Sequence, residues 1–236
     1  MGKIQWLLCW ALAAVAQFAA AQSSFTVTPL RVDLSPQASA AVVEVINTSP
    51  RPLTMQVQQR AWTQNDGVDA QRETRDLILS PTVFTLPAGE KQVVRIARRL
   101  APDSLRERAY RLIVSEVPTP ELKTTPEASG FRIALRMDLP LFVAAAQPAA
   151  PEASYEFDAT SARLSVRNSG TAHIRYTDFV VLQAGRKISE LPVFTVLPGG
   201  ERAFDLPRDR VGAAGGLRVQ AGSNVGAIDV PVADSR

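Results

Sequence analysis

Residues Phe131 to Val143 read FRIALRMDLPLFV, and every odd-numbered position in this stretch is apolar. Most of the even positions hold a charged residue or a proline. Successive side chains of a β-strand point to opposite faces, so the alternation predicts one long strand with an apolar face. At about 3.3 Å per residue it would span roughly 43 Å, whereas strands usually have about five or six residues. A domain of ordinary size buries only part of such a face, so the remainder needs another partner.

The rest of the chain shows the same strand rhythm. Alternating or Val-rich runs recur between turn sequences such as NDG at 65–67 and PAGE at 87–90. Turn signals roughly every 8 to 12 residues are typical of β-sandwiches. A Pro/Ala stretch at 144–153 has no periodicity and is typical of a linker. We therefore predict an all-β protein with two β-sandwich domains, at 22–143 and 154–236.

Two pairs of segments suggest that these domains are related. LPAGEKQVVRI at 86–96 is similar to LPGGERAFDLP at 197–207, each a turn before a strand. EVINTSPRPLTMQV at 44–57 is likewise similar to SVRNSGTAHIRYTDF at 165–179. A tandem repeat of one sandwich is the simplest interpretation of both similarities.

Residues 1–21 are predicted to be an export signal. Lys3 precedes a short apolar run, and the small residues at 19–21 form a cleavage pattern, so the mature chain is expected to begin at Gln22. The single cysteine, Cys9, lies within this signal. Without Lys3 the net charge falls from +3 to about +2, and no later apolar run reaches the roughly 18 residues needed to span a membrane. The expected location is the periplasm or the outside of the cell, with the periplasm favoured by the resemblance given below, and no integral membrane segment is expected after cleavage.

The inventory of reactive residues argues against an enzyme. His173 is the only histidine, and a lone histidine in a predicted strand is usually structural. One histidine and no mature cysteine exclude a nitrogen/sulfur zinc site. Neither a G-x-S-x-G elbow nor a glycine-rich phosphate loop is present. We expect no catalytic activity, cofactor or metal, and the mild charge gives no indication of nucleic-acid binding.

Four segments together resemble the periplasmic pilus-assembly chaperones of chaperone–usher systems, the PapD-like family. They are PLRVDLS at 29–35, LPAGEKQVVRI at 86–96, ERAYRLIVSEVP at 107–118 and RIALRMDLPLFV at 132–143. The third departs from the family at Ile113, where many members carry Asn. The resemblance implies two immunoglobulin-like domains joined at an angle, with a client cleft between them.

The resemblance also implies a mechanism, donor-strand complementation, in which a pilus subunit that lacks its last strand borrows one from the chaperone. Phe131, Ile133, Leu135 and Met137 would be the donated side chains. The three later apolar residues would close the chaperone's own core: Leu139, Leu141 and Val143. The implied partners are pilus subunits and an outer-membrane usher, for pilus assembly. An unoccupied donor strand needs protection, which a self-capping homodimer would provide.

In this family an arginine on the first strand and a lysine near the end of the donor strand bind the client's C-terminal carboxylate. Arg31 matches the arginine, but Pro140 occupies the position of the lysine. Proline carries no charge and no backbone N–H. Either Arg31 acts alone, or another base such as Arg95 or Arg111 replaces the lysine.

Two other functions compete with this interpretation. An exported β-sandwich adhesion or structural module would use the whole long strand as core. A carbohydrate-active enzyme would need two carboxylates roughly 5 to 9.5 Å apart in a cleft. Trp62 is the only tryptophan after the signal, so aromatic platforms for sugars are scarce.

Overall fold

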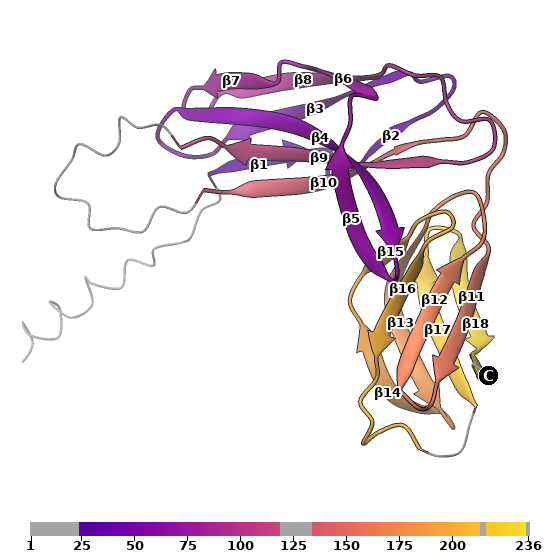
Figure 1. Cartoon of the computed structure of the whole chain (residues 1–236). Coiled ribbons are helices and arrows are strands. Elements are labelled where there is room, and N and C mark those ends of the chain that lie inside the picture. The colour runs from indigo at the N-terminus through magenta and orange to yellow at the C-terminus, as the bar shows by residue number, and fades with distance from the viewer. Residues whose placement is uncertain (1–23, 119–133, 213–215, 235–236) are drawn as a thin grey trace, which may run out of the picture.

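The computed structural model describes residues 24–118, 134–212 and 216–234. These residues form two β-sandwich domains set at an angle, so that the molecule has the shape of an L (Figure 1). No helix occurs among the described residues. The predicted fold class, all-β with two immunoglobulin-like sandwiches in tandem, is confirmed.

The first domain packs two sheets face to face. One sheet has the order β1 (Phe25–Thr28), β3 (Ala40–Asn47), β8 (Lys91–Arg98), β6 (Leu77–Ser80). The other has the order β2 (Val32–Leu34), β10 (Arg136–Val143), β9 (Arg108–Glu116), β4 (Leu53–Asn65), β5 (Val68–Glu73), and β7 (Val83–Leu86) also pairs with β4. Inward-facing apolar side chains from both sheets form one core.

The second domain repeats this plan. Its first sheet has the order β16 (Glu201–Asp205), β12 (Arg163–Asn168), β11 (Ala153–Asp158), β19 (Ala233–Asp234). Its second has the order β14 (Arg186–Leu191), β13 (Ile174–Gln183), β17 (Leu217–Ser223), β18 (Gly226–Pro231), and β15 (Phe194–Val196) pairs with β13. Aromatic side chains dominate this core, and the buried hydroxyls of Tyr155 and Tyr176 are hydrogen-bonded at 2.9 Å.

The segment between the two domains carries no strand, because β10 ends at Val143 and β11 begins at Ala153. It is nevertheless fixed to the first domain. The backbone N–H of Ala146 donates to the carbonyl of Asp103 at 2.7 Å, and Ala145 is buried. These contacts limit the freedom that the Pro/Ala composition alone would give the linker.

An asparagine ties the β7–β8 turn of the first domain to the chain that follows β3. The side-chain amide of Asn47 donates to the carbonyls of Arg51, Leu86 and Pro87 at 2.7, 2.9 and 3.0 Å. Its side-chain oxygen accepts the backbone N–H of Ser49 at 2.9 Å. Asn47 is fully buried, so these bonds satisfy all of its polar atoms where no water reaches them.

Asn168 has the same role in the second domain. Its side-chain amide donates to the carbonyls of Ala172 and Val196 at 2.8 and 3.2 Å, and its oxygen accepts the N–H of Gly170 at 3.0 Å. Asn168 is also fully buried. Asn47 and Asn168 occupy matching positions in the two similar sequence segments, which supports the interpretation that the domains are related.

We expect Asn47→Ala and Asn168→Ala each to lower the free energy of unfolding by more than about 2 kcal/mol. Each substitution removes several hydrogen bonds to backbone groups, some of them buried, and a buried group left without a partner costs about 1–3 kcal/mol. Urea unfolding followed by circular dichroism measures the change, and Gln37→Ala on an exposed loop serves as the control. A loss below about 0.5 kcal/mol at either asparagine would contradict the assigned role.

Candidate functional site

Strand β10 lies on the inner side of the angle between the domains (Figure 1). It pairs with β9 along its whole length, but with β2 only at Leu141–Val143. The main chain of 136–140 therefore borders no other strand on its second side among the residues that the structure describes. Such an open edge is a template for the addition of another strand.

Within the described residues only the later part of the predicted strand is a strand, because Ala134 and Leu135 precede β10. β10 begins at Arg136, and the predicted donor residues Phe131 and Ile133 lie outside the described residues. Leu135 and Met137 are partly buried at the margin of the first-domain core. The later odd-numbered side chains are fully within that core: Leu139, Leu141 and Val143.

The opposite face of β10 points toward the second domain. Pro140 lies directly across from Arg111 of β9. The Arg111 guanidinium lies 3.5 Å from the centre of the Trp62 ring, and that of Arg31 lies 4.9 Å from the centre of the Phe142 ring. Cations over aromatic faces gain electrostatic attraction and are held in a defined orientation.

A cavity of about 550 Å³ lies between this face and the second domain. Its charged lining residues are Arg31, Asp69, Arg111, Arg175 and Arg202. The structure thus brings two of the predicted site residues, Arg31 and Arg111, into one cavity. Arg95 is exposed on β8 of the other sheet and does not line this cavity.

The two arginines on the first-domain side differ in their ion partners. Arg31 forms a close two-pronged pair with Asp33, with distances of 2.7 and 2.8 Å. Arg111 lies 3.7 Å from Asp138, too far for a hydrogen bond. Burial lowers the pKa of the Arg111 guanidinium, while Asp138 and Asp69 act in the opposite direction. Arg111 stays protonated at any physiological pH. An anion that entered the cavity would therefore meet a positive charge that is largely shielded from water.

The angle between the domains is fixed in part by His173. Its Nδ1 lies 2.6 Å from Glu107 Oε1, which also accepts the His173 backbone N–H at 3.2 Å. The imidazole stacks on the Phe142 ring at 3.8 Å and is 4 % exposed. The lone histidine therefore has a structural place, as its sequence context predicted, and Phe142 joins this contact to β10.

The β4–β5 hairpin reaches down to the second domain (Figure 1). The Gln64 amide donates to the carbonyl of Thr195 and accepts the backbone N–H of Leu197, both at 2.8 Å. Asp69 forms an ion pair with Arg202 at 3.0 Å. These contacts place the arginines of both domains around the same cavity.

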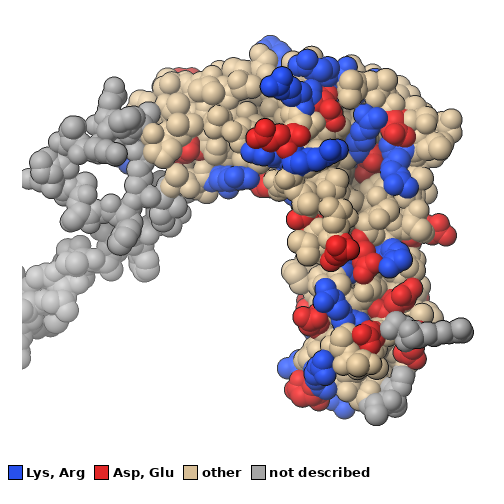
Figure 2. All heavy atoms as spheres, in the orientation of Figure 1, with Lys and Arg blue, Asp and Glu red and all other residues tan. Residues whose placement is uncertain are grey.

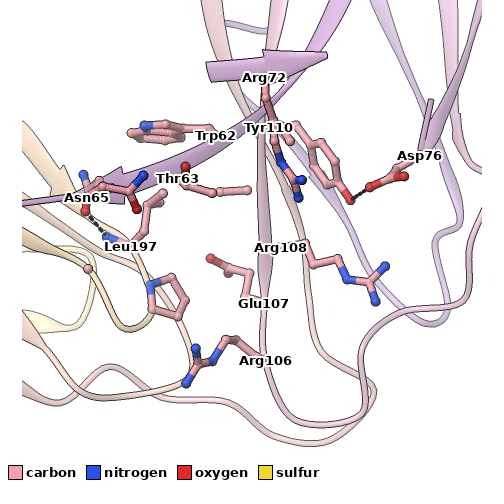
Figure 3. Close-up of a pocket in the computed structure, with 15 residues that line it drawn as sticks. Trp62, Thr63, Asn65, Arg72, Asp76, Arg106, Glu107, Arg108, Tyr110 and Leu197 are labelled. Carbon is pink, nitrogen blue, oxygen red and sulfur yellow. Dashed lines mark hydrogen bonds between the residues drawn. The ribbon is translucent and has the colours of Figure 1, made fainter. Parts of the chain in front are cut away.

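A second cavity of about 470 Å³ lies beside the same interface (Figure 3). Tyr110 and Asp76 face each other at one side of it, where the phenol donates to the carboxylate at 3.0 Å. Arg106 and Glu107 lie on another side (Figure 3). Burial, reinforced by the hydrogen bond to Asp76, raises the pKa of Tyr110 to about 12.

The surface shown in Figure 2 has no large patch of only positive or only negative charge. On the face that Figure 2 shows, acidic side chains lie among the basic ones on both domains. Within the described ranges, no group of three or more His, Cys, Asp or Glu side chains is placed to hold a metal ion. The same residues contain no helix that is long and apolar enough to cross a membrane.

Sequence reasoning missed several residues of the site. The sequence marks Trp62 only as the single tryptophan after the signal, and nothing in it distinguishes Arg175 and Arg202 from other arginines. The Gln64 contacts join residues more than a hundred positions apart, for which a single sequence offers no signal. The apolar residues around Arg111 are typical of a strand, but only the register with β10 places Arg111 opposite Pro140.

Comparison with known proteins identifies the class to which this two-domain fold and cleft belong. Residues 24–150 match the family model described as pili and flagellar-assembly chaperone, PapD N-terminal domain. This match spans more than half of the chain, so the protein belongs to the PapD-like family of pilus-assembly chaperones. No curated protein matches the sequence.

Solved structures share the fold over most of the chain. One is the CsuC–CsuE chaperone–tip adhesion subunit pre-assembly complex of Acinetobacter baumannii, with 19% identity, a TM-score of 0.68, and coverage of 91% of this chain and 100% of that one. The Salmonella enterica SafA pilin–SafB chaperone complex matches with 18% identity, a TM-score of 0.61, and coverage of 91% and 97%. The Pseudomonas aeruginosa CupB2 chaperone matches with 20% identity, a TM-score of 0.58, and coverage of 88% and 100%. At these identities the likeness shows the fold alone.

The raised pKa of Tyr110 predicts a pH dependence of stability. A group whose pKa is higher in the folded state stabilises the fold below its unfolded pKa, near 10, and loses that contribution as the pH rises toward 12. The loss should amount to about 2–3 kcal/mol, at about 1.4 kcal/mol per pKa unit. Urea unfolding from pH 9 to 12 should show a steeper decline for wild type than for Tyr110→Phe. Parallel pH profiles would contradict the assignment.

Proposed function

We propose that this protein is a periplasmic chaperone that binds pilus subunits by donor-strand complementation and delivers them to an outer-membrane usher. The observation that carries the proposal is the open edge of β10 beside a cationic cleft, in a chain of the PapD-like family. Two structures of the same fold hold a chaperone with a pilin or a tip subunit. No step of this binding requires a cofactor or a catalytic group.

The donated residues in this proposal are Phe131, Ile133, Leu135 and Met137. Burial of four large apolar side chains contributes about 6–12 kcal/mol before association costs, at about 1.5–3 kcal/mol each. Main-chain hydrogen bonds along the open edge would add affinity that tolerates different client sequences. The partial burial of Leu135 and Met137 against the chaperone's own core is the observation that favours the competing structural-module function, so the two functions need a direct test.

The carboxylate anchor in this proposal consists of Arg31 and Arg111. Arg111 replaces the family's lysine because it lies across from Pro140 and faces the same cavity. Its long distance to Asp138 and its burial leave it the better placed of the two to bind a client carboxylate. Arg31, whose guanidinium lies over the Phe142 ring, would contribute a second cation in the same cavity.

The donor-strand role predicts the behaviour of the double variant Ile133→Asp/Leu135→Asp. Its yield of a co-expressed pilus subunit, purified from periplasm, should fall more than about tenfold, because two apolar contacts are lost. The double variant Ile78→Asp/Val83→Asp is the matched control, since both of those side chains are exposed on other strands of the first domain.

Circular dichroism and thermal melting must show that both double variants are folded. Unfolding of the Ile133/Leu135 variant alone would favour the structural-module function, because those side chains would then belong to the protein's own core. A folded variant that still retains the subunit would rule out the donor-strand assignment.

The anchor role predicts that Arg111→Gln and Arg31→Gln each weaken subunit binding by about 10- to 100-fold, the range expected when a charge-assisted hydrogen bond is lost. Arg95→Gln carries the same charge change on the other sheet and should leave the affinity unchanged. Isothermal titration of the purified subunit measures all three. A larger loss for Arg95→Gln than for Arg111→Gln would overturn the choice between these two bases.

A further inference from the structure

The second domain contributes two arginines to the interdomain cavity. Arg175 belongs to β13 and Arg202 to β16, and both line the cavity that Arg31 and Arg111 line from the first domain. Arg202 is paired with Asp69. Arg175 is exposed, and within the described part of the chain no carboxylate forms an ion pair with its side chain. Among the residues that the structure describes, Arg175 is therefore the lining cation without an ion partner, and it belongs to the second domain.

Donor groups without acceptors gather around the same cavity. Three buried side-chain N–H groups of its lining residues have no hydrogen-bond partner in the described part of the chain: Trp62 Nε1, Arg111 Nε and Arg202 Nε. A buried donor without an acceptor costs about 1–3 kcal/mol. Each of these atoms is inaccessible, so a ligand with acceptor oxygens would reach it only if the side chain turned toward the cavity.

The charges around the cavity leave about one positive charge after the ion pairs are counted, and it lies at Arg175. Four arginines and one aspartate line the cavity, which gives the lining itself a net charge of about +3. Asp33 and Asp138 pair with Arg31 and Arg111 from outside the lining. The positive charge that remains is thus displaced toward Arg175, away from the site proposed for the client's terminal carboxylate.

Apolar side chains flank this charged centre on both domains. Leu30 is 62% exposed on the first domain and Val193 is 54% exposed on the second, and both line the cavity. A ligand that fits such a site has anionic groups with apolar neighbours. The C-terminal segment of a polypeptide that contains an acidic residue meets that description.

We propose that the cleft binds two carboxylates of its client. Arg31 and Arg111 bind the terminal carboxylate, and Arg175 with Arg202 binds an acidic side chain among the client's last few residues. The inference rests on the proposed function of the cleft and makes it more specific. Arg175 is then a specificity-determining residue, and the preferred clients carry an aspartate or glutamate close to their C-terminus.

The test uses the full mature chain and short, fluorescently labelled peptides with alternating apolar and polar residues. Four forms of each peptide combine a free or an amidated C-terminus with Asp or Asn, placed in turn along the last few positions. Fluorescence anisotropy gives the Kd of each form for wild type, Arg175→Gln and Arg186→Gln. Arg186 is exposed on β14 and does not line the cavity, so it is the matched control.

For wild type and Arg186→Gln, we expect Asp at one position to tighten binding about tenfold relative to Asn, as a charge-assisted pair does. For Arg175→Gln, this preference should fall to within about twofold, while the preference for a free C-terminus remains. Rescue of the preference by Arg175→Lys would show that the charge is responsible.

The two proposals fail in different ways. A wild-type protein that distinguishes free from amidated termini but not Asp from Asn contradicts the second carboxylate site and leaves the anchor intact. Indifference to both changes, or no peptide binding at all, contradicts the anchor and with it the inference that rests on it. A preference for Asp that survives in Arg175→Gln assigns the acid to another cation and overturns the role of Arg175.

Discussion

The cleft depends on the two-sided alternation of β10. The side chains of Leu139, Leu141 and Val143 are buried in the first-domain core. Because successive side chains of a strand point to opposite faces, Pro140 and Phe142 must point away from that core. A slip of one residue would exchange the two faces, which the buried Leu141 and Val143 prevent. The core residues at the end of the strand thus determine where the cleft begins, and the same pairing leaves the edge of 136–140 open.

A second condition is the angle between the domains. The arginines come from both domains, so their common cavity exists only while the interface holds. Glu107, His173 and Phe142 form one continuous contact across that interface, from a hydrogen bond to a ring stack. Phe142 belongs to β10, the strand that would pair with a client. The same strand therefore also takes part in the interdomain contact that forms the cleft.

Much of this architecture follows from local sequence, and the rest does not. The period of two predicts the strands, the turn sequences place their ends, and the paired segments around Asn47 and Asn168 indicate the repeat. The sequence alone does not decide whether Arg95 or Arg111 lines the cleft. Both arginines lie in predicted strands, and only the pairing of those strands distinguishes them. Arg175 and Arg202 are equally ordinary in sequence, because the contact of two domains, not a motif, gives them their place.

The substitution of proline at position 140 has a physical consequence for the proposed mechanism. A lysine on the donor strand would place the carboxylate anchor on the edge that a client strand joins. Arg111 lies instead on β9, which is paired on both sides, by β10 and by β4, and its guanidinium is held against Trp62. In the proposed mechanism the anchor therefore belongs to the interior of the sheet. Strand addition at the edge of β10 and carboxylate binding in the cleft then become separate contributions, and adjustment of the edge strand to one client or another leaves the anchor in place.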